Sequence, residues 1–393
     1  MPRPNEAGHL AYNHAILTHL AGLGHDVTVV LAHPRMPALR QGTGALHVVG
    51  PGLRTGPGSI AVARPRDALR ILSRTALGLL PRALGERLRR QGRTGTYGDV
   101  DAIIGRFLTP AEAEEAARFT EGADWVIADT IFRAPVLDFA GRARPAIITH
   151  DIFHARHAAL AGRGLKLFPA SLEAAQEAAL LAKAQLLVAI QPEEAEALQA
   201  LVPGTAVLTA LMPARLVPRA PGTPREDGRI VFVGSSGAHN ADGMRWFLAE
   251  VWPQLQRLLP TARLDVCGTV CRTLGSPPPG VTLHGMVPDL APMLHRASVA
   301  VAPLRAGSGL KIKLLDYVAH GLVTVTTPVG TAGFLRTADW PFVEADNAVA
   351  FAAAAAHLAQ GAGPRDQQAL DYAARYDAAH VFGPLAQALA SPA

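Results

Sequence analysis

Apolar and polar positions along the chain predict helices and short buried strands in alternation. The first helix has an apolar stripe made of Leu10, Ile16, Leu17, Leu20 and Leu23. Gly24 follows the stripe and is expected to end the helix, and the apolar run 26–31 then has the length and composition of a buried strand. This order of helix, glycine and strand is half of a β–α–β unit.

The same alternation continues through the rest of the chain. In the first half it predicts strands at 125–128, 146–149 and 186–190, and a helix around 172–183. In the second half it predicts strands at 229–233, 262–267, 281–283, 299–302 and 323–326, and one amphipathic helix at 242–259. Residues 348–389 are expected to be mostly helical. Short apolar strands separated by helices are typical of parallel α/β sheets.

Prolines and glycines without periodicity mark residues 213–228 as a linker. We therefore expect an N-terminal Rossmann-like domain at 1–212 and a C-terminal Rossmann-like domain at 229–375. A terminal helix at 376–393 is expected to pack back on the first domain. Two parallel sheets joined by a hinge would face each other across a cleft, with ligands at the carboxyl ends of the strands.

The strand that should precede the first helix is missing, because the chain opens with Met-Pro-Arg-Pro-Asn-Glu-Ala-Gly. We hypothesise that the start of this sequence lies downstream of the natural start. An upstream in-frame stretch without an apolar strand of about 4–8 residues would contradict this hypothesis.

Composition narrows the class of protein. The formal net charge is +5 and aromatic residues are scarce, so the stacking surface of a nucleic-acid binder is not expected. Cys267 and Cys271 have no second pair at zinc spacing, and the pattern predicts no metal site. The N-terminus does not have the pattern of a signal peptide, and no apolar run reaches the roughly 18–20 residues of a membrane span. We expect a cytoplasmic protein.

Residues 64–93 carry nine arginines and only two acids, with leucines between them. This pattern predicts a pair of basic amphipathic helices. Such helices can lie on an anionic membrane, here the inner face, as a peripheral contact. The alternative, which we favour, is a solvated helix face rich in arginine.

The segment 302–321 carries the clearest candidate chemistry. A strand ends at Ala302, a glycine-rich turn follows, and a helix is expected from near Ser308 to Gly321. Free backbone N–H groups at such a turn can bind phosphate, and Arg305 and Lys313 add positive charge without a metal. Asp316 shares a helix face with Lys313 and could accept hydrogen bonds from ribose hydroxyls. The alternative is an ordinary strand–helix turn with an i,i+3 ion pair.

This segment resembles the donor-binding motif of retaining glycosyltransferases of family 4, also called group 1, in the subgroup with Gly-Ser-Gly-x-Lys-x-Lys. The matching positions are Pro303, Leu304, Arg305, Gly307, Ser308, Gly309, Lys311, Lys313, Ala319 and Gly321. Two positions depart from the family pattern. Asp316 stands where the family usually has Glu, and Ala332 replaces the acid in a turn at 330–333 that is otherwise similar.

The resemblance implies the GT-B fold and transfer of a sugar, of the hexosyltransferase type, from a nucleoside diphosphate sugar to a hydroxyl acceptor with retention. Surface polysaccharide, lipid-linked or related glycan synthesis is the implied setting, without a cofactor or metal. Arg305, Lys313 and the amides of Ser308 and Gly309 would stabilise the leaving diphosphate. Lys311, Asp316 and Gly333 would also contact the donor, with Asp316 on the ribose.

Three residues of the first domain are further candidates. Gly8 and His9 stand where the family's glycine-rich loop meets the first helix, and they are expected to bind the donor. His150 follows a strand, as a His does in many members, and would face the reacting groups. The alternative for His150-Asp151 is a strand-end histidine followed by a helix cap, and Asp129, at the end of another strand, is also more simply explained as a cap.

Two other functions fit parts of the pattern. A nucleotide-sugar epimerase of the same fold would rearrange its donor without an acceptor. A non-catalytic nucleotide-sugar-binding protein is favoured by Asp316, Ala332 and the missing first strand, and it would bind donor without turnover.

Overall fold

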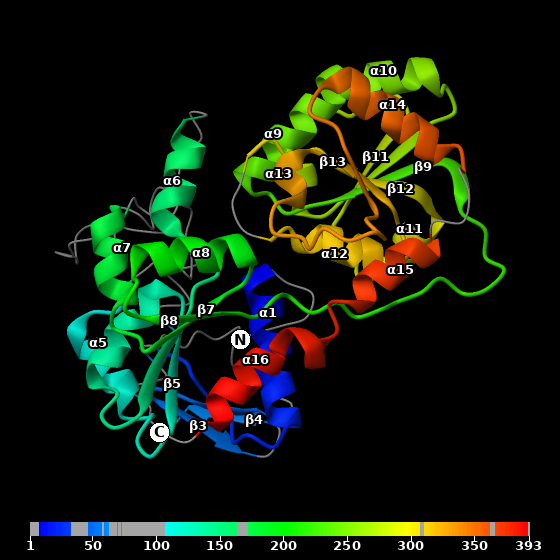
Figure 1. Ribbon diagram of the computed structural model, residues 1–393. Coiled ribbons are helices and arrows are strands. Elements are labelled where there is room, and N and C mark those ends of the chain that lie inside the picture. The colour runs from blue at the N-terminus through cyan, green and yellow to red at the C-terminus, as the bar shows by residue number, and fades with distance from the viewer. Residues whose placement is uncertain are drawn as a thin grey trace. The chain divides into compact units, whose positions relative to one another are not determined.

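The computed structural model describes residues 8–32, 46–56, 59–62, 69, 72, 107–162, 172–306, 310–361 and 366–391. The chain divides into two compact units (Figure 1). The first comprises 1–157, 167–210 and 382–393, and the second comprises 158–166 and 211–381. Apart from Leu69 and Leu72, the arginine-rich segment 64–93 lies outside the described residues.

The first unit is built around a four-stranded parallel sheet in the order β5-β6-β7-β8. Its elements are α1 (Gly8–Gly22), β1 (Thr28–Val30), β2 (His47–Val49), β3 (Leu53–Gly56), β4 (Ser59–Val62), α5 (Pro110–Ala117), β5 (Trp125–Asp129), η1 (Ile131–Phe139), β6 (Arg144–Ile148), α6 (Phe153–Ala161), which continues into the second unit, α7 (Ala174–Leu181), β7 (Leu186–Ala189), α8 (Pro192–Leu201) and β8 (Ala206–Thr209). β1 pairs with β2 in parallel, and β3 pairs with β4 as an antiparallel hairpin.

The predicted strands of this unit are confirmed as β1, β5, β6 and β7. Gly24 has a φ of 93°, a left-handed conformation that glycine adopts without strain, and this turn separates α1 from β1. The core of the unit lies where β5, β6 and β7 meet α5 and η1, with Ile147 and Leu187 fully buried on neighbouring strands.

The second unit is a six-stranded parallel sheet in the order β11-β10-β9-β12-β13-β14. Its elements are β9 (Glu226–Val233), α9 (Ala238–Trp246), η2 (Phe247–Val251), α10 (Trp252–Leu258), β10 (Arg263–Cys267), η3 (Thr269–Thr273), β11 (Val281–Gly285), α11 (Ala291–Arg296), β12 (Ala297–Ala302), α12 (Ile312–Ala319), β13 (Thr324–Thr326), α13 (Pro328–Thr331), β14 (Phe342–Glu344), α14 (Ala348–Ala359), α15 (Asp366–Ala374) and the beginning of α16 (Ala378–Ala390), which continues into the first unit. Counted along the chain this is the strand order 3-2-1-4-5-6 of a doubly wound nucleotide-binding sheet, and the prediction of parallel α/β sheets in two domains is confirmed.

Two helices of this unit differ from the prediction. The helix expected at 242–259 is interrupted by the π-turn η2, where the Trp252 N–H donates to the Phe247 carbonyl five residues earlier. Pro253, the second residue of α10, has no N–H to donate to the carbonyl four residues earlier, which explains the change in hydrogen bonding. The helix expected from near Ser308 begins only at Ile312, because Lys311 has a non-helical ψ of 83°. Its predicted end is confirmed, since Gly321 has a φ of 70°.

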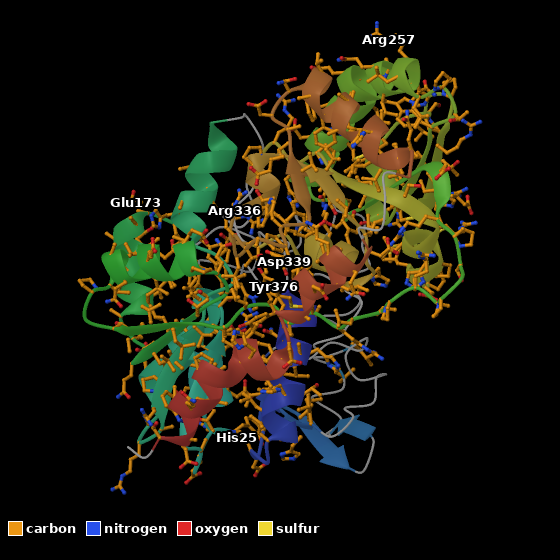
Figure 2. All side chains as sticks on the ribbon, turned by 45° about the vertical axis from the view of Figure 1, so that its right-hand side comes forward. His25, Glu173, Arg257, Arg336, Asp339 and Tyr376 are labelled. Carbon is orange, nitrogen blue, oxygen red and sulfur yellow. The ribbon has the colours of Figure 1, made fainter. Side chains whose placement is uncertain are left out.

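An aromatic cluster fixes the segment that follows α13. The rings in mutual contact are Phe334, Trp340, Phe342, Tyr372 and Tyr376. The Tyr372 hydroxyl donates to the Leu335 carbonyl and the Leu335 N–H donates to the Tyr376 hydroxyl, both at 3.0 Å. Asp339 and Tyr376 are labelled in this region in Figure 2. These contacts attach α15 and the chain after it to the sheet edge at β14.

None of the helices in the described part of the chain combines the length and hydrophobicity that a membrane crossing requires.

Candidate functional site

The carboxyl ends of β9 and β12 define the candidate site of the second unit. These two strands are hydrogen-bonded neighbours, and the chain order reverses between them. In doubly wound sheets this switch point leaves a crevice where ligands bind. The segment 234–237 leads from β9 into α9, and the segment 303–311 leads from β12 toward α12.

Lys313 lies at this point on the first turn of α12. Its ammonium donates a hydrogen bond to Asn240 Oδ1 of α9, and its Nζ lies 4.5 Å from the centre of the Phe232 ring of β9. The residue is half-buried. Burial, together with the positive charge of the neighbouring Lys311, lowers the pKa of Lys313 to about 7. A nearby anion would stabilise its charged form.

Asn240 is itself held in one orientation. Its Nδ2 donates to both the carbonyl oxygen and the hydroxyl oxygen of Ser235 at 3.1 Å, and its side chain is buried. Gly234 is needed beside it, because a Cβ there would lie 2.8 Å from the Phe232 ring. The turn after β9 therefore fixes the amide that contacts Lys313.

Arg305 follows β12 and is exposed, with its guanidinium carbon 5.6 Å from the ring centre of the buried Trp246. The start of its segment is held on two sides. Thr327 donates a hydrogen bond from its hydroxyl to the Leu304 carbonyl. Gly243 of α9 packs so closely that a Cβ there would lie 2.1 Å from the Pro303 carbonyl oxygen.

The other predicted donor residues of this unit have different environments. Lys311 is buried, whereas Asp316 is exposed to solvent. The surrounding protein raises the pKa of Asp316, but water screens this effect at an exposed carboxyl. No ion pair joins Asp316 to Lys313 in the described structure, so the i,i+3 pair considered from sequence does not form.

Gly333 is buried with a φ of 86°, in the turn before the aromatic cluster. Ser308 and Gly309 lie outside the described residues.

α12 is joined to the end of β9 by one further bond. The Tyr317 hydroxyl accepts a 2.7 Å hydrogen bond from the Val233 N–H. This contact and the pair formed by Lys313 and Asn240 hold α12 at the switch point.

A second polar constellation lies in the first unit, at the carboxyl ends of β5 and β6. His150 Nε2 lies 2.8 Å from Asp129 Oδ1 and 3.1 Å from Asn13 Oδ1 of α1. The Tyr12 ring packs edge-on against the imidazole at 5.3 Å between centroids. His150 has a φ of 57°, a conformation that non-glycine residues adopt at a cost and that is frequent at functional sites.

An acid of another helix binds the first N–H groups of the helix that follows His150. α6 begins at Phe153, and its N–H groups at Phe153 and His154 each donate to the carboxylate of Glu177 at 2.8 Å. Asp151 instead pairs with Arg156 at 3.0 Å. The helix cap considered for Asp151 from sequence remains a prediction, and Asp129 faces the imidazole.

Gly8 and His9 are the first two residues of α1, on the same helix as Asn13. The side chain of His9 lies outside the described part of the structure.

Sequence reasoning missed two buried acids in this unit, Glu177, which binds the first N–H groups of α6, and Glu194. Glu194 of α8 is 3% exposed and lies 2.8 Å from the Thr149 hydroxyl. Burial is the largest cause that raises the pKa of Glu194 to about 7. The sequence signal is an acid in the first turn of a helix, where an ordinary surface acid is also favourable.

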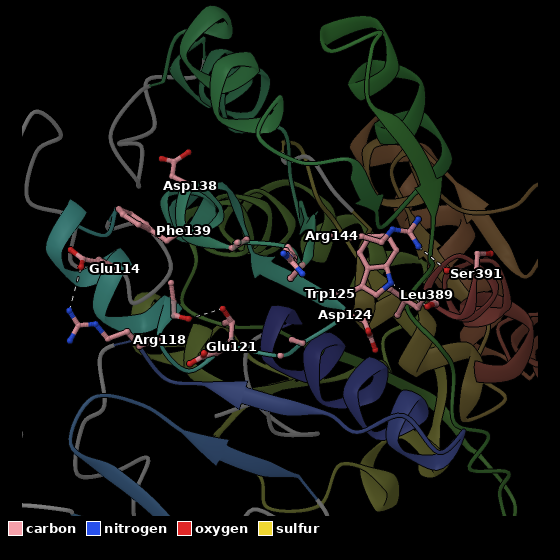
Figure 3. A pocket seen from close by; sticks show the side chains of 18 of the residues that line it. Glu114, Arg118, Glu121, Asp124, Trp125, Asp138, Phe139, Arg144, Leu389 and Ser391 are labelled. Carbon is pink, nitrogen blue, oxygen red and sulfur yellow. Dashed lines mark hydrogen bonds and ion pairs between the residues drawn. The ribbon is translucent and has the colours of Figure 1, made fainter. Parts of the chain in front are cut away.

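Within the described residues, no group of three or more His, Cys, Asp and Glu side chains is placed to hold a metal ion. A surface hollow of about 1050 Å³ lies between the end of α5, the start of β5 and the C-terminal residues of α16 (Figure 3). Trp125 and Arg144 begin their strands there and hydrogen-bond to the carbonyls of Leu389 and Ser391. The hollow thus lies at the amino edge of the sheet, away from the edge where ligands of such sheets bind.

Comparison with known proteins finds one family whose model matches part of the second unit. Residues 227–361 match the family model of the group 1 glycosyl transferases. The matched segment lies within the second unit and contains Arg305, Lys311, Lys313, Asp316 and Gly333. No curated protein sequence matches the chain.

Solved structures show the fold of the whole chain. Sucrose-phosphate synthase from Thermosynechococcus elongatus is 14% identical with a TM-score of 0.63, over 97% of this chain and 92% of that chain. TarM is 11% identical with a TM-score of 0.57 over 72% of this chain, and the match spans 58% of the length of TarM. HepE from Anabaena in complex with UDP is 11% identical with a TM-score of 0.56, over 72% of this chain and 82% of that chain. These likenesses show the GT-B fold, as the sequence predicted.

Proposed function

We propose that the protein transfers a sugar, of the hexosyl type, from a nucleoside diphosphate sugar to a hydroxyl acceptor with retention of anomeric configuration. The observation that carries this proposal is the half-buried Lys313 at the switch point of a group 1 glycosyl transferase domain, held by a neutral amide. A cation in this position matches the charge of a diphosphate group.

The chemical task is to stabilise the leaving diphosphate. The bond from the anomeric carbon to the diphosphate oxygen breaks, a bond to the acceptor oxygen forms, and the hydroxyl proton is released. Lys313 and Arg305 supply positive charge where negative charge develops, and the backbone amides of Ser308 and Gly309 are proposed to add hydrogen bonds. Asp316, exposed on the same helix as Lys313, is proposed to bind the ribose.

Because side-chain cations supply the charge, we propose that the reaction needs neither metal nor cofactor. Lys311 and Gly333 complete the proposed donor site in this unit. In the first unit, Gly8 and His9 are proposed donor contacts, and His150, oriented by Asp129, is proposed to contact the reacting groups.

The acceptor is proposed to be a surface polysaccharide, a lipid-linked glycan or a related glycan. Both cysteines are free thiols, which suits a reducing cytoplasm. The peripheral contact with the inner face of an anionic membrane remains a prediction on residues 64–93.

Nucleotide-dependent stabilisation of the purified protein tests the proposal. UDP, GDP and ADP and their common sugar conjugates are added without metal, UDP first because HepE was solved with UDP-glucose. One diphosphate should raise the melting temperature saturably, since a ligand that binds only the folded state stabilises it. Lys313→Ala should abolish the shift and lower kcat/KM at least tenfold.

Arg257→Ala is the matched control, because Arg257 is an exposed cation on α10 of the same unit (Figure 2). It should bind and turn over donor as the wild-type protein does. A wild-type shift that persists in Lys313→Ala would remove Lys313 from the site. Stabilisation by a diphosphate sugar without transfer to any acceptor would indicate a non-catalytic binding protein, and rearrangement of the sugar without acceptor would indicate an epimerase.

A further inference from the structure

Lys313 has an unusual set of partners for a half-buried cation. Its ammonium can donate three hydrogen bonds. In the structure it donates to the amide oxygen of Asn240 and lies over the face of the Phe232 ring. Among the described residues no carboxylate pairs with it. A cation removed from water is normally paired, so this arrangement leaves charge and hydrogen-bonding capacity for a ligand.

Asn240 is suited to orient this cation without neutralising it. Its oxygen faces Lys313 because its Nδ2 donates to Ser235 at both the carbonyl and the hydroxyl oxygen. An aspartate would have the same shape but would form an ion pair, and the net charge available to a diphosphate would fall. A neutral acceptor fixes the ammonium and preserves its charge.

We propose that Asn240 is a positioning residue, which holds the Lys313 ammonium at the carboxyl ends of β9 and β12 for the donor diphosphate without pairing it with a negative charge. This inference rests on the proposed function, since it requires Lys313 to bind the diphosphate. The inference adds Asn240 of α9 to the donor site. Asn240 has this role because its side chain is neutral.

The groups around Lys313 agree with this role. Lys311 adds positive charge from the same segment, whereas Asn240 of α9 and Phe232 of β9 are neutral. The pKa of Lys313 is lowered to about 7 in the free protein, so a bound diphosphate would favour proton uptake by this lysine. Diphosphate affinity should therefore fall as the pH rises above 7.

A double-mutant cycle tests whether Asn240 acts through Lys313. Dissociation constants are measured by calorimetry for the wild type, Asn240→Ala, Lys313→Met and the double variant. The probe is whichever of UDP, GDP and ADP stabilises the wild type most. Asn240→Ala should weaken binding at least fivefold in the wild-type background and less than twofold in the Lys313→Met background. Gln256→Ala is the control. It removes a side-chain amide of α10 that donates to the Pro279 carbonyl, and it should leave binding unchanged.

Asn240→Asp provides a readout that a merely structural role would not change. The added carboxylate should raise the pKa of Lys313, so the pH above which the diphosphate is lost should move upward by at least one unit. Its affinity at pH 7 should nevertheless be at least fivefold weaker than that of the wild type. This isosteric variant also keeps the test usable if Asn240→Ala does not fold.

The outcomes separate the two proposals. If Lys313→Met binds the diphosphate as tightly as the wild type, the assignment of Lys313 fails and the role of Asn240 fails with it. If Lys313→Met weakens binding but Asn240→Ala has equal effects in both backgrounds, or Asn240→Asp leaves the pH midpoint unchanged, only the role of Asn240 is overturned.

Discussion

The Thr149 hydroxyl oxygen lies 2.8 Å from Glu194 Oε1 and 3.1 Å from the Val188 carbonyl oxygen. A hydroxyl has one proton, so it cannot donate to both when Glu194 is ionised. A proton on Glu194 resolves the conflict, because Glu194 then donates to Thr149 and Thr149 donates to Val188. Oε2 meanwhile accepts from the Ile190 N–H at 3.1 Å. This geometry agrees with the raised pKa of Glu194, which burial causes first and the charge of Asp151 increases.

Glu194→Gln should remove a pH dependence of stability. The pKa of Glu194 is about 7 in the folded protein and the ordinary pKa of a glutamate is 4.5, so the unfolded chain releases its proton first as the pH rises. The contribution of this group is present below about pH 4.5 and is lost as the pH rises through 7, a loss of as much as about 3 kcal/mol. Urea unfolding at pH 5 and pH 8 measures it. Glutamine can still donate to Thr149, so the variant should lose less stability than the wild type between these pH values.

Glu193→Gln is the matched control, because Glu193 is the exposed neighbour on the same helix turn. Its stability should change with pH as that of the wild type does. An equal pH dependence in Glu194→Gln and the wild type would show that Glu194 is ionised in the folded protein, and the proton assignment would be wrong.

The sequence predicted most of the strands that form the two sheets and the segment that carries Arg305 and Lys313. Both predictions rest on local patterns, namely apolar runs of strand length and a glycine-rich turn between a strand and a helix. The position of that turn at the switch point follows from strand order, which local pattern does not encode. Five short strands were not predicted, namely β2 and β14 with three residues each and β3, β4 and β8 with four each.

The residues that hold the candidate sites were harder to predict, because their roles depend on partners distant in sequence. Asn240 contacts a lysine 73 positions away, and Asp129 contacts a histidine 21 positions away. Glu194 has the sequence context of a surface acid at a helix start, but its side chain is bonded to Thr149, 45 positions earlier. Such pairings arise from tertiary packing, so a single sequence shows the residue types without their contacts.

Gly243→Ala should disturb the donor site through the backbone. The new Cβ would lie 2.1 Å from the Pro303 carbonyl oxygen and 3.0 Å from its carbon, so α9 and the chain after β12 must move apart. Overpacking of this kind costs about 1–3 kcal/mol of unfolding free energy, measured by chemical denaturation. Affinity for the nucleoside diphosphate should fall as well, because Arg305 lies only two positions after Pro303. Gly275→Ala, with nothing within 4 Å of its Cβ position, should change neither quantity, and a Gly243→Ala protein of wild-type stability would contradict the close approach.

Asp129→Ala should separate the chemistry of the first unit from nucleotide binding in the second. The change removes the 2.8 Å contact to His150 Nε2. His150 has a φ of 57°, a costly conformation, so its side chain should be less firmly oriented without this contact. We therefore expect kcat/KM for sugar transfer to fall about tenfold, a loss of roughly 1.4 kcal/mol of transition-state stabilisation. The dissociation constant of the diphosphate should stay within about twofold of the wild-type value.

Asp138→Ala, which breaks an exposed ion pair with Lys183 in the same unit, should transfer sugar normally. Parallel losses of diphosphate affinity and turnover in Asp129→Ala would show that this pair maintains the fold and does not orient a reacting histidine.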